Sequence, residues 1–198
     1  EAAGRRYAQE NRRTFVSPYN DGQVIAGQGT LGREAARQLA GAPAAGWVVP
    51  TGGGGLISAI GALLADMPSR PMLIGVQAAA SPFTYSLFHH HTQQGVQDLP
   101  TLADGLSGAV EEGSITIPMI ERCVDDLLTV SEEEIARAIA FAWYVYQEVI
   151  EGAAAAALAA ALYHRADLRP AVVILTGGNI DPPLHRKILE AHAGERWD

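Results

Sequence analysis

Four consecutive glycines, at positions 52–55, are the feature that most constrains the fold of this 198-residue chain. They follow an apolar segment at residues 47–50 and precede residues 56–60, which have the pattern of a first helical turn. Glycines at a strand-to-helix turn leave backbone N–H groups uncovered, and the helix dipole makes that point electropositive. The segment therefore predicts a cradle for a phosphate group. A flexible linker is the alternative, but linkers are not usually bounded by a strand and a helix.

Two common nucleotide-binding loops do not fit the glycine run. The dinucleotide fingerprint needs a third glycine where this chain has Ile57 or Ser58, and the next predicted strand ends in Gln77 instead of an acidic residue. A nucleoside-triphosphate loop needs an adjacent lysine, and the only lysine of the chain is Lys187. A small phosphorylated cofactor is therefore the better candidate.

The bulk properties restrict the class of partner. The net charge is −8 and no basic run offsets it, which argues against nucleic acid. A single cysteine, Cys123, excludes an intrachain disulfide and suits a reducing compartment. No apolar run is long enough to span a bilayer. We therefore expect a cytoplasmic protein with no nucleic-acid or membrane partner.

Strand-like and helix-like segments alternate along the chain. The expected strands are residues 14–17, 47–50, 72–77, 127–130 and 171–176. The expected helices are residues 23–40, closed by Gly41, then 56–65, 82–94, about 131–149, 152–165 and a last helix from about 182. The fourth of these begins with a capping box of Ser131 and Glu134. Several strands are continuously apolar, so we expect an α/β fold with a mainly parallel sheet in three αβα layers.

In such sheets ligands bind outside the carboxyl ends of the strands. Three groups fall at that edge: the glycine run, Glu151 with Gly152, and Thr176 with the glycines that follow it. Thr176 could alternatively just end a strand, and Glu151 could be an acid that satisfies a helix dipole. The three histidines at positions 89–91 would face different directions on a helix, which argues against a shared metal.

Eight short segments together resemble one enzyme family. They are residues 18–21, 24–30, 52–56, 103–106, 124–126, 130–134, 151–153 and 175–179. In this order they resemble the fold-type II (tryptophan-synthase-β-like) pyridoxal-phosphate enzymes, specifically the branch of threonine/serine dehydratases and serine racemases. The resemblance covers nearly the whole chain. It implies that residues 21–198 are most of the large cofactor-binding domain and residues 1–20 the tail of the small domain.

The resemblance also implies roles for individual residues. The backbone N–H groups that would bind the phosphate of pyridoxal 5′-phosphate are those of Gly52, Gly53, Gly54, Gly55 and Leu56. Thr176 stands where the family places a hydroxyl against the pyridine nitrogen, an arrangement that suits prompt β-elimination. Glu151 matches a glutamate near the ring and the substrate, which makes it the catalytic candidate, and Gly105 lies in a loop that lines the same pocket.

Two features of the family are missing. The family holds its cofactor through a Schiff-base lysine in a Ser-x-Lys context, whereas Lys187 lies in the last predicted helix. A Ser-Gly-Asn loop for the substrate carboxylate is missing as well. We therefore expect the chain to be the C-terminal part of a longer enzyme, inactive alone. Some relatives also bind a divalent cation after the third strand, but residues 77–83 contain no carboxylate, so we expect no metal there.

The resemblance implies that the parent protein is a pyridoxal-phosphate-dependent ammonia-lyase. Its reaction would be β-elimination on a β-hydroxy amino acid such as threonine or serine, giving a 2-oxo acid and ammonia, and the family's habit implies a homodimer. An amino-acid racemase of the same family is one alternative. A non-catalytic remnant that binds phosphate or a partner is the other.

Overall fold

The computed structural model describes residues 2–39, 41–42 and 44–197. Its sheet has four strands, β1 (Gly46–Pro50), β2 (Met72–Ala78), β3 (Asp126–Val130) and β4 (Ala171–Val173). All pairs are parallel and the strand order is β3-β2-β1-β4. Val48 of β1 pairs with Ile74 on one side and Val173 on the other. The predicted parallel sheet is therefore confirmed.

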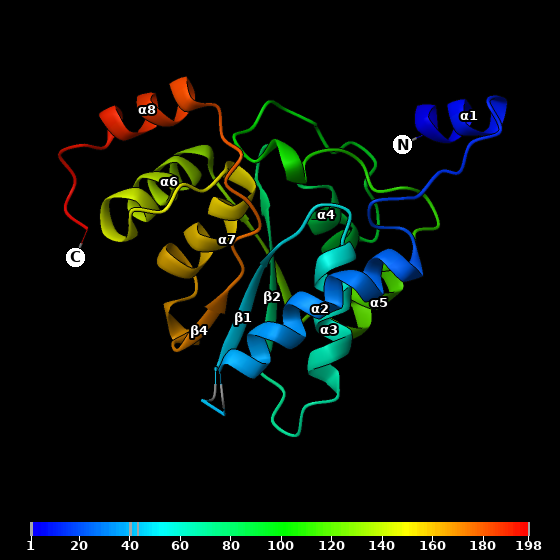
Figure 1. Cartoon of the computed structure of the whole chain (residues 1–198), viewed down its shortest axis with the longest axis horizontal. Coiled ribbons are helices and arrows are strands. Elements are labelled where there is room, and N and C mark those ends of the chain that lie inside the picture. Colours follow the sequence, from blue (N-terminus) through cyan, green and yellow to red (C-terminus); the bar gives the residue numbers. More distant parts are fainter. Residues whose placement is uncertain (1, 40, 43, 198) are drawn as a thin grey trace.

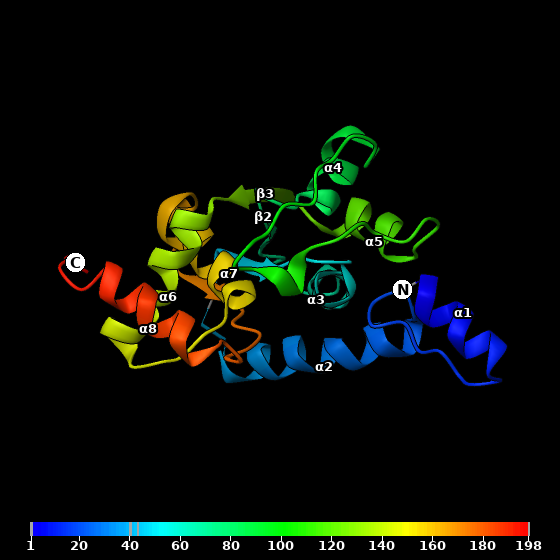
Figure 2. The ribbon, with the colours of Figure 1, turned by 90° about the horizontal axis from the view of Figure 1, so that it is seen from above.

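Helices cover both faces of this sheet (Figure 1, Figure 2). One side carries α2 (Gly22–Gln38), α3 (Gly55–Ala65), α4 (Phe83–His90) and α5 (Thr116–Cys123). The other carries α6 (Glu132–Tyr146), α7 (Gly152–Tyr163) and α8 (Pro182–Ala191). A short helix α1 (Ala2–Glu10) lies apart from the sheet. The three-layer αβα prediction is confirmed, and none of the described helices is long and apolar enough to cross a membrane.

Strand β1 separates the two halves of the core. Trp47 and Val49 pack in one buried cluster with α2, α3 and α5, whereas Val48 packs in the other with α6, α7 and α8. This alternation is the period-two geometry of a strand. The alanine-rich α7 is buried along nearly its whole length and contacts all four strands. Alanine allows this close approach because its side chain adds little width.

Some expected element bounds are wrong. Residues 14–17 form no strand, because the segment runs from α1 to the turn before α2 without pairing to the sheet. The strand expected over residues 171–176 ends at Val173. The helix expected to reach Ala40 ends at Gln38; Ala40 lies outside the described residues, and Gly41 has a φ of +85°. Helix α4 ends early because His91 adopts a left-handed conformation.

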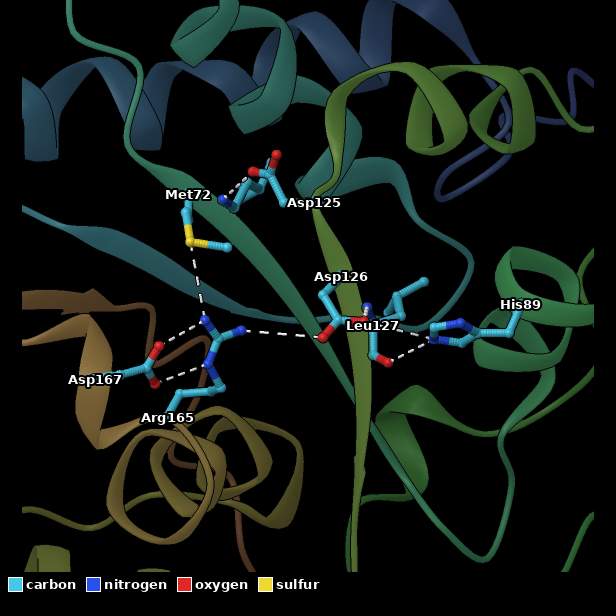
Figure 3. A network of polar contacts seen from close by, with 8 residues as sticks. Met72, His89, Asp125, Asp126, Leu127, Arg165 and Asp167 are labelled. Carbon is cyan, nitrogen blue, oxygen red and sulfur yellow. Dashed lines mark hydrogen bonds and ion pairs between the residues drawn. The ribbon is translucent and has the colours of Figure 1, made fainter.

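Side chains occupy the outer edge of β3, a strand at one end of the sheet (Figure 3). The N–H of Leu127 donates to Asp126 Oδ1 at 2.9 Å, and Nε2 of His89 lies 2.9 Å from the Leu127 carbonyl oxygen. Arg165 forms an ion pair with Asp167 and extends to within 4.0 Å of Asp126. Both backbone groups of Leu127 are thus engaged, which protects an edge that could otherwise pair with another strand.

The predicted capping box is present at the start of α6. The Ser131 hydroxyl accepts the Glu134 N–H at 3.3 Å, and the Glu134 carboxylate accepts the Ser131 N–H at 2.7 Å. Burial alone would raise the pKa of Glu134, but hydrogen bonds from Ser131 and His164 outweigh burial and hold this pKa below its ordinary 4.5. The ionised carboxylate therefore stabilises the folded chain at pH values above its ordinary pKa of 4.5, and this stabilisation is lost as the pH falls through the lower folded pKa.

Ser131→Ala should lower the free energy of unfolding by about 1 kcal/mol, because it removes the acceptor for an orphan helix N–H. Urea titrations at pH 7 measure this change. The Ser131 hydroxyl also donates to the Glu134 carboxylate at 2.8 Å. The folded pKa of Glu134 is depressed, so this part of the stabilisation is lost as pH falls through the folded value, and the deficit should shrink in acid. Ser69→Ala, at an exposed turn, is the control and should change nothing. Equal stabilities of S131A and the parent chain would contradict the prediction.

Candidate active site

The residues expected at the cofactor site line one cavity of about 790 Å³ at the carboxyl ends of the strands. They are Gly52, Gly53, Gly54, Gly55, Leu56, Gly105, Glu151 and Thr176. The glycine loop joins β1 to α3, Gly105 lies in a single 3₁₀ turn, and Glu151 immediately precedes α7. Segments more than one hundred residues apart in the sequence therefore converge on one space.

The glycine loop presents free backbone donors. Gly54 is the N-cap of α3 with a φ of +89°, a conformation that strongly favours glycine, and offers no side-chain cap. The first helical bond runs from the Ser58 N–H to the Gly54 carbonyl at 3.0 Å. No described residue accepts a hydrogen bond from the N–H groups of residues 53–56. Such a helix N-terminus has the donors and the dipole that an anion requires.

The other three glycines of the loop are required because neighbouring residues occupy the space that a side chain would need. A Cβ on Gly53 would overlap the ring of Tyr19, and one on Gly55 would lie 3.0 Å from Tyr19 Cα. A Cβ on Gly52 would lie 3.3 Å from Leu106 Cα. Protein atoms therefore pack directly on this loop, and a side chain at these positions would push them off. Tyr19 belongs to the segment that carries the family resemblance, yet sequence reasoning assigned it no role at the site.

Tyr19 is tied to residues just beyond the 105–109 segment that lines the cavity. Its hydroxyl oxygen accepts the Glu111 N–H at 2.8 Å. The Glu111 carboxylate accepts a hydrogen bond from Asn20 at 2.7 Å and forms an ion pair with Arg5 at 2.6 Å. Asn20 also accepts the Ile115 N–H at 3.0 Å. The segment before α2 is thereby fixed against residues 111–115.

Glu151 and the Thr176 loop meet at the second side of the cavity. The Glu151 N–H donates to the Gly177 carbonyl at 3.0 Å. A Cβ on Gly177 would lie 2.5 Å from Glu151 Oε1, so the carboxylate lies directly on this backbone. Glu151 is the N-cap residue of α7 but its carboxylate makes no capping hydrogen bond, so its interaction with the helix is limited to the dipole. The exposed Thr176 precedes Gly177 and borders the same cavity.

The other side chains that could carry chemistry lie outside the cavity and make structural contacts. His89 covers the edge of β3, and Cys123 is buried. The Gln77 side chain, at the end of the strand after which some relatives bind a cation, accepts the Tyr85 N–H at 2.7 Å. Among the described residues no group of three or more His, Cys, Asp or Glu side chains could hold a metal ion.

A glycine cradle at a helix N-terminus, with a carboxylate and a hydroxyl across one cavity of a parallel α/β sheet, is typical of proteins that bind a phosphorylated ligand. The chain belongs to the family described as pyridoxal-phosphate dependent enzyme, whose model matches residues 1–177. The family resemblance found in the sequence is therefore confirmed.

Individual relatives agree with this assignment. The chain is 36% identical over 189 residues to an L-threonine ammonia-lyase of Thermotoga maritima, a match covering 94% of this chain and 46% of that protein. It is 33% identical over 181 residues to a serine racemase of Dictyostelium discoideum, covering 88% of this chain and 55% of the relative. The processed threonine deaminase isoform 2 of Solanum lycopersicum superimposes with a TM-score of 0.85 at 26% identity, covering 98% and 57% of the two chains. The chain thus spans about half the length of these relatives.

Gly54→Ala should lower the free energy of unfolding by about 2 kcal/mol or more, measured by urea titration. An alanine there adopts a left-handed φ, at roughly 1–2 kcal/mol, and its Cβ would also lie 2.5 Å from Ile120 Cδ1. Gly95→Ala is the matched control, because Gly95 has a φ of +81° but nothing within 4 Å of its Cβ position. Equal losses for the two variants would refute the packing contribution at Gly54.

Proposed function

We propose that the protein containing this chain is a pyridoxal-phosphate-dependent ammonia-lyase that acts on a β-hydroxy amino acid such as threonine or serine. The products would be a 2-oxo acid and ammonia. The observation that carries the proposal is the convergence of the glycine cradle, Glu151 and Thr176 on one cavity, in a chain 36% identical to an L-threonine ammonia-lyase.

The residues present fit the phosphate of the cofactor. The free N–H groups of residues 53–56 at the start of α3 offer several donors and a favourable dipole to a dianion. When bound, pyridoxal phosphate would supply the electron sink that stabilises negative charge at the substrate Cα. The phosphate cradle would set the position of the ring relative to Glu151 and Thr176.

The chain's own side chains would then have distinct tasks. Thr176 would offer a neutral hydroxyl to the ring nitrogen, which leaves that nitrogen without a charged partner. Glu151, fixed over Gly177, would receive a hydrogen bond from the bound ring or the substrate and hold a proton near the leaving group. The backbone around Gly105 would close the wall beside the substrate.

The rest of the site is expected outside these residues. Lys187 lies on α8 and does not line the cavity, so we expect the Schiff-base lysine in a further part of the protein. We also propose that residues 1–20 belong to the small domain, which agrees with the position of α1 apart from the sheet (Figure 2). A homodimer and a cytoplasmic location stay predictions from the sequence.

The decisive assay uses the full-length protein loaded with pyridoxal phosphate and supplied with L-threonine or L-serine. Formation of a 2-oxo acid with equal release of ammonia is the expected result. Inversion at Cα without 2-oxo acid would favour the racemase, an alternative supported by the 33% identity to a serine racemase. Neither product from any β-hydroxy amino acid would favour a non-catalytic remnant.

Glu151→Gln in the same protein should lower kcat about 100-fold, because the amide cannot exchange a proton with the substrate. Glu148→Gln is the control, since Glu148 is exposed and lies outside the cavity lining. Steady-state assays of 2-oxo acid formation measure both variants. Unchanged kcat in E151Q would remove Glu151 from the chemistry.

A further inference from the structure

We infer that two buried threonines, Thr84 and Thr116, are positioning residues of the phosphate cradle, because their hydroxyls fix which way the amides of Gly53 and Gly54 point. This inference rests on the proposed function of the glycine loop. Neither threonine lines the cavity. Each acts on the loop from behind, through a carbonyl oxygen.

The contacts are short and buried. Thr84, at the start of α4, donates from Oγ1 to the Gly52 carbonyl at 2.5 Å and is 3% exposed. Thr116, the first residue of α5, donates from Oγ1 to the Gly53 carbonyl at 2.7 Å and is fully buried. The two donors come from different helices, which places two independent anchors on consecutive peptide groups of the loop.

Because peptide groups are planar, holding a carbonyl oxygen also determines where the next N–H points. In a trans peptide the C=O and the following N–H point in opposite directions. If Thr84 holds the Gly52 carbonyl, the Gly53 N–H must point away from Thr84. By the same logic Thr116 turns the Gly54 N–H away from itself. Because the loop lines the cavity and the threonines do not, both N–H groups face the cavity side.

Such anchors are needed because the loop is made of glycine. A peptide group flanked by glycines meets few steric barriers and can adopt the opposite orientation. In that orientation the carbonyl oxygen would face the cavity and repel a phosphate. The two hydroxyls therefore supply the directional preference that the glycine backbone lacks.

A third hydroxyl supports the second anchor. Ser114 Oγ lies 2.8 Å from Thr116 Oγ1, and Ser114 is 2% exposed. Since Thr116 has one hydroxyl proton and gives it to Gly53, Ser114 must be the donor in this pair. The chain Ser114 to Thr116 to Gly53 polarises each successive bond in the same direction and strengthens the hold on the carbonyl.

The test compares two ligands that differ only in the phosphate. The full-length protein and its variants Thr84→Val and Thr116→Val are titrated with pyridoxal phosphate and with pyridoxal, following tryptophan fluorescence. We expect each valine variant to lose about 10-fold in affinity for pyridoxal phosphate, with pyridoxal affinity unchanged. Thr116→Ser keeps the hydroxyl and should restore binding.

Thr30→Val is the matched control, because its hydroxyl also bonds a backbone carbonyl, that of Gly27 at 2.7 Å, but on α2 and outside the cavity lining. It should leave both affinities unchanged. An equal loss for pyridoxal and its phosphate in T84V and T116V, or no loss at all, would overturn the inference. Wild-type protein with equal affinity for the two ligands would overturn the proposed function itself.

A measurement on the wild-type protein covers the case in which the valine variants do not fold. In protein labelled with ¹⁵N-glycine, the amide resonances of Gly53 and Gly54 should both move downfield when pyridoxal phosphate is added, since each N–H would gain a charged acceptor. Gly95, in an open loop, should not move. Stationary Gly53 and Gly54 resonances in the presence of bound cofactor would refute the inward orientation.

Discussion

The junction between β1 and α3 depends on how hydrogen bonds are distributed at the glycine loop. Buried hydroxyls satisfy the loop's carbonyl oxygens, and the opposite amide groups remain without a protein partner among the described residues. Buried or partly buried donors without partners are rare because they cost free energy. The fold maintains this state because β1 and α3, which flank the loop, pack together in one hydrophobic cluster. The site is thus a group of backbone N–H donors that lack protein acceptors and are held in place by the surrounding fold.

Contacts between distant segments complete this site. Tyr19 packs on Gly53 and joins the loop to Glu111, whereas Glu151 packs on Gly177. In both cases the absence of a glycine side chain makes room for another residue of the protein. The glycines therefore allow close packing of the cavity walls, and under the proposed function they would also give the cofactor phosphate access to the backbone.

The sequence predicted the parts of this arrangement that depend on local pattern. Apolar runs and the Ser131 capping box marked the sheet and the start of α6, and the family resemblance marked Glu151 and Thr176. Thr84 and Thr116 could not be found in this way, because a threonine that bonds a loop 32 or 63 residues away leaves no local signal. Residues 14–17 were assigned wrongly because a strand-like pattern forms a strand only where a neighbouring strand is available.

The two edges of the sheet differ in what they permit. At β3, His89 and Asp126 already occupy the outward backbone groups of Leu127. At the other end, β4 has three residues, all of them only partly buried. Another strand could join β3 at Leu127 only by displacing the two side chains. A fifth strand would therefore have to break both contacts first, so His89 and Asp126 act as a stop at this end of the sheet.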